Sequence, residues 1–259
     1  MLIEPSLDAV LRFCALAPVE RVFLEDVARR GLGRFVAVEE DDGALAALCY
    51  VGANLVPSGR GCGAFAEPAA RGLSRMIIGE QRAVDDLWEA AARRMPEPRE
   101  DRPGQPVYEL TEAPEPGGTG LRAATPEDFA RLLPACAAAH EEELGIDPLA
   151  DDADTFRWRT RAQIEDGRSW LWLEDDVILF KAEASAWTPS AVQVQQVWVD
   201  PEARGRGNAK RALRDLCRRL LATTPTVTLF VRTDNAPAIR LYESIGMHRV
   251  LSYRSILFP

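Results

Sequence analysis

The chain has 259 residues, of which 47% are hydrophobic and 27% are charged, and this composition is typical of a globular protein that can bury a core of useful size. Its formal net charge of −9 argues against general binding to nucleic acid, whose phosphates attract basic surfaces. No apolar run approaches the ~18 residues that a membrane-spanning helix needs, so we expect no membrane partner.

The cysteines and histidines argue against two further classes of protein, secreted proteins held by disulfides and proteins with a zinc site. The five cysteines are odd in number and widely spaced, and they include no C-x-x-C pair. The first residues, MLIEPSLDAV, lack the basic start and the apolar core of a secretory signal peptide, so we expect a cytoplasmic protein with reduced thiols. His140 and His248 are the two histidines, and without a His/Cys cluster we expect no metal site.

The segment EAPEPGGTG, residues 112–120, divides the chain. It is rich in Pro and Gly and carries no large apolar side chain, as is typical of a linker. It separates an N-terminal domain, residues 1–111, from a C-terminal domain, residues 121–259.

The N-terminal part predicts a mixture of helices and strands. A helical pattern covers residues 7–16, and the strands RFVAVEE and ALAALCYVG flank a DDG hairpin signal. Residues 74–95 predict a strand that turns into an amphipathic helix, and QPVYEL predicts a closing strand. We interpret SGRGCGAF, residues 58–65, as a loop, because no helical pattern begins at its glycines.

The C-terminal part predicts antiparallel hairpins followed by a β-α-β-α-β run. A short strand precedes a helix that Thr125 can cap, with Pro126 in its first turn. A hairpin follows around residues 174–176, then a strand at 191–200, a helix, a strand at 226–233, a second helix and a final strand. The fold class is therefore α/β (α+β), with a mixed sheet flanked by helices.

The strand at residues 191–200 has a break in its apolar alternation. Val192 and Val194 alternate, and so do Val197 and Val199, but the step between the pairs is three residues. A β-bulge near Gln195 and Gln196 would restore one apolar face, whereas a strand buried on both faces would not need to alternate.

The motif ARGRGNA, residues 203–209, lies between this strand and a clear amphipathic helix. Such a helix start leaves unpaired N–H groups at the positive end of the helix dipole, and glycines let the backbone approach an anion. This geometry suits a pyrophosphate, although the motif alone also fits an ordinary strand-to-helix turn. The basic residues that follow on the outer face of the helix would then face the same phosphates.

Two stretches resemble the GNAT N-acetyltransferase family. VWVDPEARGRGNAKRAL is similar to its V-x-P-x-x-(Q/R)-x-x-G-x-(G/A) signature, and RTDNAPAIRLYESIGM is similar to N-x-x-A-x-x-x-Y-x-x-x-G-(F/M). The whole chain resembles a two-domain subgroup of that family in the stretches FKAE (180–183), QVQQVWV (193–199) and EELG (142–145).

The resemblance implies a GNAT fold for residues 121–259, acetyl-CoA as cosubstrate and a primary amine of a small molecule or peptide as acceptor. By resemblance, Tyr242 would protonate the departing thiolate as general acid. The implied cofactor-binding residues are Val197, Trp198, Val199, Arg204, Gly205, Arg206, Gly207, Asn208, Ala209, Asn235, Ala238 and Tyr242.

The general base is not evident, because the strand before the motif carries glutamines where many family members carry a glutamate. Glu183, beside Lys181 within a strand, is one candidate for the base, and its alternative is an outward-facing residue. The stretch HEEELG, residues 140–145, is another, and its alternative is a solvated helix end.

The N-terminal domain is a candidate for a degenerate copy of the same fold. RMIIGEQRAVDDLWEAA imitates strand, turn and helix, but Gly79, Glu80 and Gln81 do not match the pyrophosphate signature, so we expect no productive CoA binding there. The sequence thus predicts an N-acetyltransferase, monomeric or homodimeric, and the alternative is a non-catalytic CoA-binding sensor or scaffold.

Overall fold

The same order of helices and strands occurs twice along the chain in the computed structural model, which describes residues 2–72 and 74–259. The first half contains β1 (Leu2–Ile3), α1 (Leu7–Ala15), α2 (Pro18–Arg29), β2 (Arg34–Glu39), β3 (Leu45–Val51), β4 (Asn54–Gly59), α3 (Ala66–Arg71), β5 (Met76–Glu80), α4 (Gln81–Ala91) and β6 (Glu100–Leu110). The second half contains β7 (Arg122–Ala123), α5 (Phe129–Leu144), α7 (Ala153–Glu165), β8 (Ser169–Glu174), β9 (Val177–Trp187), β10 (Val192–Val199), α8 (Asn208–Leu221), β11 (Val227–Phe230), α9 (Ala236–Ser244) and β12 (His248–Leu257). A short helix, α6 (Pro148–Asp151), is inserted between α5 and α7.

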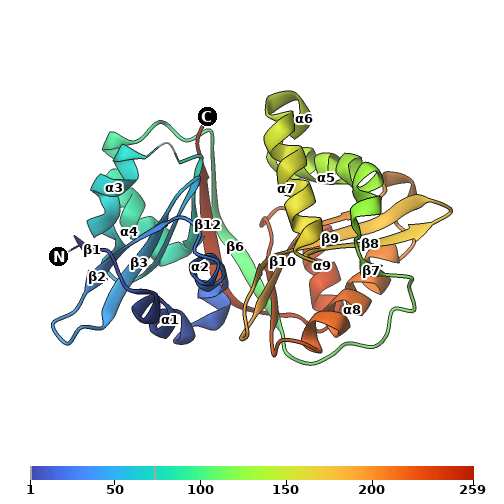
Figure 1. The fold of residues 1–259 in the computed structure, drawn as a ribbon, viewed down its shortest axis with the longest axis horizontal. Coiled ribbons are helices and arrows are strands. Elements are labelled where there is room, and N and C mark those ends of the chain that lie inside the picture. The colour runs from blue at the N-terminus through green and yellow to red at the C-terminus, as the bar shows by residue number, and fades with distance from the viewer. Residues whose placement is uncertain (1, 73) are drawn as a thin grey trace.

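The two halves exchange their last strands. The sheet order is β1-β2-β3-β4-β5-β12-β6-β11-β10-β9-β8-β7, so β12 of the second half pairs with β5 of the first. In the same way β6 of the first half pairs with β11 of the second. Both strands run between the two halves in Figure 1. The exchange joins the halves through one continuous sheet, and it confirms the predicted mixed α/β fold class.

Helices cover both faces of the sheet in each half. In the first half one face packs against α1 and α2 and the other against α3 and α4, with Leu24 and Leu87 fully buried on opposite sides. In the second half one face packs against α5 and α7, and the other against α8 and α9. Of the helices in the described residues, none is both long and apolar enough to cross a bilayer.

A buried ion pair joins the halves on one face. The guanidinium of Arg168, just before β8, donates two hydrogen bonds of 2.9 and 2.6 Å to the carboxylate of Asp26 on α2. Their side chains are 10% and 4% exposed, so the two charges satisfy each other away from water. Beside them, Val22 of α2 packs against Ala186 and Ala191 of the other half.

The hairpin turn and the helix cap that the sequence predicted in the second half are both present in the structure. Asp175 and Asp176 both adopt positive φ in the β8–β9 hairpin turn, as a two-residue hairpin loop requires. Thr125 and Asp128 form a capping box, in which the Thr125 N–H donates to the Asp128 carboxylate at 2.8 Å.

The stretch SGRGCGAF is not the loop that its sequence suggested. Residues 62–65 form a 3₁₀ turn that continues into α3, directly after β4. This is the place in the first half that the ARGRGNA motif occupies in the second, whereas the segment at Gly79 corresponds to the β11–α9 connection. The helical pattern was missed because α3 is only 6 residues long and its buried residues are Ala66 and Ala69.

Residues 112–120 contain no helix or strand and lie against α8. The Asp215 carboxylate accepts hydrogen bonds from the N–H groups of Gly117 and Thr119 at 2.7 and 2.8 Å. Arg211 and Arg218 donate to backbone carbonyls of this segment. These two arginines therefore hold the linker, which corrects, for them, the expectation that the basic residues of the helix face phosphates.

Replacing Arg168 with Leu should destabilise the protein by about 3–5 kcal/mol, because the buried Asp26 carboxylate loses both of its close hydrogen bonds and keeps only Arg30, 3.9 Å away. The double replacement Asp26→Leu/Arg168→Leu should lower the free energy of unfolding by clearly less than Arg168→Leu does, because no unpaired charge stays buried. Urea unfolding measures both, and Arg60→Leu, which breaks the exposed pair with Glu40, should cost less than about 1 kcal/mol. An Arg168→Leu protein as stable as wild type would contradict the structural role of this pair.

Candidate active site

Strands β10 and β11 begin as a parallel pair and then separate. Their register covers Val192 with Val227 and Gln193 with Thr228, and beyond these residues the β11-facing edge of β10 has no strand partner in the described chain. Since a strand edge presents rows of N–H and C=O groups, this edge can receive an extended ligand as if it were another strand.

A bulge in β10 produces the separation. The register with β9 shifts between Gln195 and Trp198, and Gln196 adopts φ +54°. The bulge predicted from the break in alternation is therefore present. A positive φ is costly for a residue other than glycine, and such strain is typical of functional positions. The bulge turns the Gln196 side chain toward the end of α5, where its amide donates a hydrogen bond to the Glu143 carboxylate.

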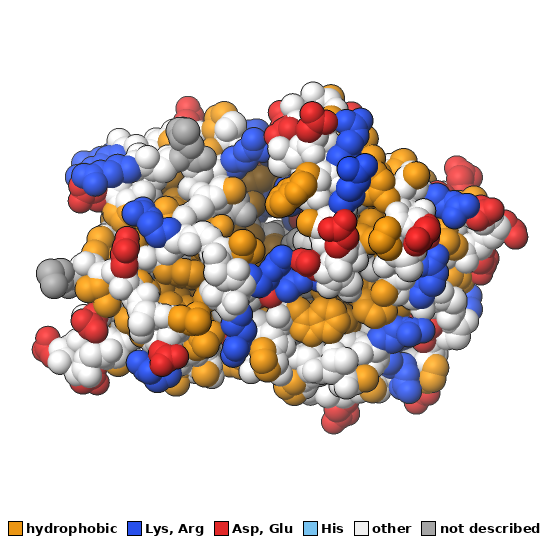
Figure 2. Space-filling view, in the orientation of Figure 1, with side chains coloured by type: hydrophobic (Ala, Val, Ile, Leu, Met, Phe, Trp, Pro, Cys, Tyr) orange, Lys and Arg blue, Asp and Glu red, His pale blue; other side chains and the backbone are white. Residues whose placement is uncertain are grey.

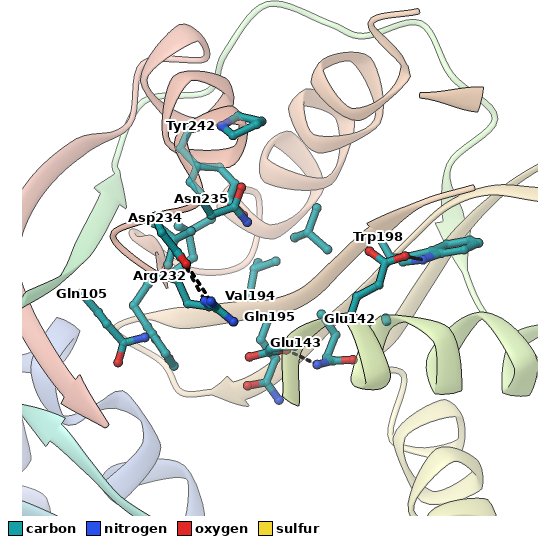
Figure 3. A pocket seen from close by; sticks show the side chains of 17 residues that line it. Gln105, Glu142, Glu143, Val194, Gln195, Trp198, Arg232, Asp234, Asn235 and Tyr242 are labelled. Carbon is teal, nitrogen blue, oxygen red and sulfur yellow. Dashed lines mark hydrogen bonds and ion pairs between the residues drawn. The ribbon is translucent and has the colours of Figure 1, made fainter. Parts of the chain in front are cut away.

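The gap between the strands forms a cavity of about 450 Å³. Its walls include Val194, Val197 and Trp198 of β10, Asn235 and Tyr242 of the α9 region, and Glu142 and Glu143 of α5. Figure 3 shows the two glutamates on one helix end, opposite Asn235 and Tyr242. The Glu142 carboxylate accepts hydrogen bonds from the Trp198 indole at 3.2 Å and from the Arg204 guanidinium at 2.7 Å, which ties α5 to the strand and to the following loop.

The glycine-rich loop opens beside this cavity. Gly205 and Gly207 have φ of +75° and +80°, and a Cβ on either would meet nothing within 4 Å. In the described chain the backbone N–H groups of residues 205–208 have no hydrogen-bond partner, and α8 begins at Asn208. The Arg204 side chain holds the loop by donating to the Val199 carbonyl at 3.0 Å. The loop is thus an open set of N–H donors at a helix N-terminus.

The start of α9 contributes the remaining side chains. The Asn235 side-chain oxygen caps the helix by accepting from the Ala238 N–H at 3.1 Å, which leaves its amide nitrogen as a donor toward the cavity. Tyr242 is 7% exposed and lines the same cavity. Burial, and then the nearby Glu143 carboxylate, raise the pKa of Tyr242 above its ordinary value, so its hydroxyl keeps its proton at neutral pH.

A second cavity of about 330 Å³ adjoins the first and lies between the two halves. Glu143, Gln195 and Gln196 line both cavities. The first half contributes Phe23 of α2, Asn54 of β4 and Gly79 of β5, among others, and the second half contributes Cys136, His140, Phe156, Arg159 and Glu183. Figure 2 shows the surface hollowed between α7 and the first half. We call this cavity the inter-half chamber.

Two of the three carboxylates that line the chamber, Glu143 and Glu183, have pKa values that are shifted in opposite directions. Burial raises the pKa of Glu143 despite the nearby positive charges of Arg102 and Lys181. Burial acts in the same sense on Glu183, but the Lys181 ammonium at 2.8 Å outweighs it and lowers the pKa of Glu183. Glu143 is thus the more readily protonated of these two carboxylates, whereas the Lys181 ammonium favours the ionised form of Glu183.

The structure divides the predicted residues among three places. Val197, Trp198, Asn235 and Tyr242 line the first cavity. Arg204 to Ala209 form the loop beside it, with Val199 at the end of β10 and Ala238 behind the cap of α9. Glu183 lies in the chamber and in an ion pair, not at the junction of the two cavities.

Glu143 is the site residue that sequence reasoning named only as part of a stretch. Cys136, His140 and Glu143 are spaced i, i+4 and i+7 on α5, and all three line the chamber. That spacing is visible in the sequence, but the alanines between these residues carry the stronger amphipathic signal and direct attention to the core face.

The corresponding region of the first half differs in two ways. Strands β3 and β4 pair without a register shift from Ala47 with Gly59 to Val51 with Leu55, so no bulge opens β4. At the turn after β4, a Cβ on Gly63 would lie 3.2 Å from the Asp86 carboxylate oxygen. A carboxylate at that point repels a phosphate. In the described residues no group of His, Cys, Asp and Glu side chains is arranged to hold a metal ion.

Comparison with known families agrees with this geometry. Residues 133–247 match the acetyltransferase (GNAT) family, and residues 33–132 match a domain of unknown function, DUF4081. The C-terminal part of the chain is therefore a GNAT acetyltransferase domain, preceded by a DUF4081 domain.

Similar proteins cover different shares of the chain. The N-alpha-acetyltransferase RimI of Mycobacterium tuberculosis is 44% identical over 62 residues, which are 24% of this chain and 38% of that protein. A mycothiol acetyltransferase of Mycolicibacterium smegmatis is 30% identical over 154 residues, covering 51% of this chain and 48% of that one. The chain spans less than half the length of the curated relatives it matches. A GNAT acetyltransferase structure from Colwellia psychrerythraea shares the fold over 100% of both chains, with a TM-score of 0.62 at 12% identity.

Proposed function

We propose that this protein transfers an acetyl group from acetyl-CoA to a primary amine of a small molecule or peptide. The observation that carries the proposal is the continuity of two binding features, the unpaired edge of β10 and the open N–H groups of residues 205–208. An extended arm that pairs with the strand edge leads its diphosphate end to the helix N-terminus. The named acetyltransferases among the relatives support the same reaction.

The residues present fit acetyl-CoA, which when bound supplies an activated acetyl thioester. The open N–H groups of residues 205–208 bind the pyrophosphate, and the β11-facing edge of β10 at Val197 and Val199 pairs with the amide-containing arm. The free amide nitrogen of Asn235 donates to the same arm. The thioester then lies in the first cavity, between Tyr242 and Glu143.

Glu143 is the proposed general base and replaces Glu183 in that role. An amine must lose a proton to attack, and Glu143 lies where the chamber meets the first cavity. Its raised pKa brings it closer to the working pH, which favours proton transfer. Glu183 remains an ionised neighbour that is held by Lys181.

Tyr242 is the proposed general acid. The amine nitrogen forms a bond to the acetyl carbon, the carbon–sulfur bond breaks, and the leaving sulfur receives a proton from the Tyr242 hydroxyl. Because burial keeps this hydroxyl protonated, the donor is available throughout the neutral range. The proton taken by Glu143 returns to solvent, and the tyrosine is reprotonated through the open cavity.

Acetyl-CoA should bind wild-type protein in calorimetry, and Gly207→Val should weaken the affinity roughly tenfold or more, because a β-branched residue at φ +80° forces the loop away from its open conformation. Gly43→Val is the matched control, since Gly43 has φ +82° and equally open surroundings in the distant β2–β3 turn. No binding by the wild type, or equal binding by both variants, would contradict the proposed site.

Tyr242→Phe should lower the acetylation rate by roughly 10²–10⁴-fold while the affinity for acetyl-CoA is kept, since the phenol contributes its proton only to the reaction. Tyr108→Phe is the control, because its ring lies 6.1 Å from that of Tyr242 and its hydroxyl bonds to Glu243 instead. Stopped-time assays of thiol release measure both. Equal rates for Tyr242→Phe and wild type would remove the acid role. Binding of acetyl-CoA without turnover on any amine would favour the sensor alternative.

The rate should fall as the pH drops through the raised pKa of Glu143, because the base must be deprotonated to act. Glu143→Gln should remove this acidic limb from the profile of kcat/KM and lower the rate at every pH above it. Glu141→Gln, on the exposed side of the same helix end, should keep the wild-type profile. An unchanged acidic limb in Glu143→Gln would assign the base to another group.

A further inference from the structure

The charges of the inter-half chamber are unevenly compensated. Most ionised side chains that line it have a partner of opposite charge within the protein. Arg102 donates two hydrogen bonds to the Glu100 carboxylate at 2.7 and 2.6 Å. Glu183 pairs with the fully buried Lys181, and Glu20 lies 3.6 Å from the Arg21 guanidinium.

His140 adds no charge to this balance. Its ring packs edge-on against Phe156, with centroids 5.7 Å apart. Burial, and then the positive charge of Arg159, lower the pKa of His140, so the ring is neutral at physiological pH.

Two lining charges are left, and they have opposite signs. In the described residues neither the Glu143 carboxylate nor the exposed Arg159 guanidinium has an ion-pair partner. The Glu143 carboxylate accepts from the neutral Gln196 amide, and Arg102 donates to the backbone carbonyl of Glu143 and not to its carboxylate. Glu143 lies on α5 at the junction with the first cavity, whereas Arg159 lies on α7. A ligand that neutralises both must carry a positive and a negative group.

A buried, unsatisfied group lies next to Arg159. Gln163 follows Arg159 by four residues on α7, so both side chains lie on the chamber face of the helix. The Gln163 side-chain oxygen is buried and has no hydrogen-bond partner among the described residues. Such an acceptor is costly unless a donor group of a ligand or a water satisfies it, so a polar ligand is expected at this end of the chamber beside the donors of Arg159.

We propose, on the basis of the acetyltransferase function above, that the acceptor is a small amine that also carries a carboxylate, as amino acids and short peptides do. Arg159 binds the carboxylate, with Gln163 beside it, and Glu143 faces the amine. An arginine fork matches the two oxygens of a carboxylate, so it selects acceptors that have this group.

The first half supplies the wall for the remainder of the acceptor. Phe23, Val56, Met76 and Ile78 line the chamber from α2, β4 and β5, and they present apolar side chains. A volume of about 330 Å³ lies at the small end of ligand cavities and fits a compact molecule or the first residues of a peptide. The first half thus takes part in selecting the acceptor, and preferred acceptors combine the charged groups with an apolar side chain.

The test compares matched acceptors with and without the carboxylate. Purified wild-type protein and acetyl-CoA are incubated with free amino acids with apolar side chains, with dipeptides, and with the carboxamide and decarboxylated amine of each, and thiol release is measured. We expect the carboxylates to be acetylated with KM values roughly ten- to hundredfold below those of their amides, as the loss of a charge-assisted bond predicts. The ratio between free amino acids and dipeptides distinguishes the two sources of the carboxylate.

Variants of α7 separate recognition from structural effects. Arg159→Gln should raise KM for the carboxylates to that of the amides, with kcat and the KM for amides unchanged. Arg159→Glu should move the preference toward diamines, which a merely structural role would not do. Arg157→Gln is the control, since Arg157 lies on the same helix, pairs with the neighbouring Asp154 at 3.4 Å and is not among the described residues that line the chamber.

Three outcomes overturn the proposal. Amides or decarboxylated amines could be acetylated as well as the carboxylates, or Arg159→Gln could leave every KM unchanged. Acetyl-CoA could also bind in calorimetry while no carboxylate in the panel is acetylated. Each of these leaves the acetyl-CoA site standing. Failure of the wild type to bind acetyl-CoA is the separate result that removes the proposed function itself.

Discussion

Strand β12 pairs with β5 on one side and with β6 on the other, so neither half of the chain has a complete sheet without the last strand of its neighbour. The exchanged strands β6 and β12 are 11 and 10 residues long, and separating them would expose the apolar cores on both sides. The halves are therefore held in one relative position. The chamber depends on this constraint, because its two walls come from different halves and have no other continuous connection through the sheet.

Strain and charge are concentrated at the junction of the two cavities. The bulge in β10 places Gln196 at positive φ, and the hydrogen bond of Gln196 holds Glu143 where the cavities meet. Nearby, Lys181 and Glu183 neutralise each other under full burial, so the chamber keeps an ionised carboxylate without a net charge from that pair. The different partners of Glu143 and Glu183 thus shift the pKa values of the two carboxylates in opposite directions. Such shifts allow identical side chains to play different parts in proton transfer.

Sequence reasoning found the elements whose apolar spacing is regular and whose ends carry local signals, and it missed those that depend on distant partners. Helix α2 buries Glu25 and Asp26 among its apolar residues, and the close partner that satisfies Asp26 is Arg168, 142 positions further along the chain. Strand β4 contains Pro57, which argues against a strand in any single-sequence interpretation. Helix α7 buries just Thr160 and Ile164, because its inner face lines a polar chamber instead of a core.

The same distinction applies to the site. The glycine loop, the bulge and the cap at Asn235 are each made by consecutive residues, so their local chemistry was visible in the sequence. Glu143 and Arg159 belong to one chamber only because α5 and α7 pack on the same face of the sheet and the first half encloses them. Arg159 is itself exposed and Glu143 is half-buried, so recognition of an acceptor by opposite charges depends on the enclosure that brings both side chains beside one ligand. The exchange of strands lies away from the reacting groups. It nevertheless fixes the two halves around the chamber, so that Glu143 and Arg159 can bind the same ligand.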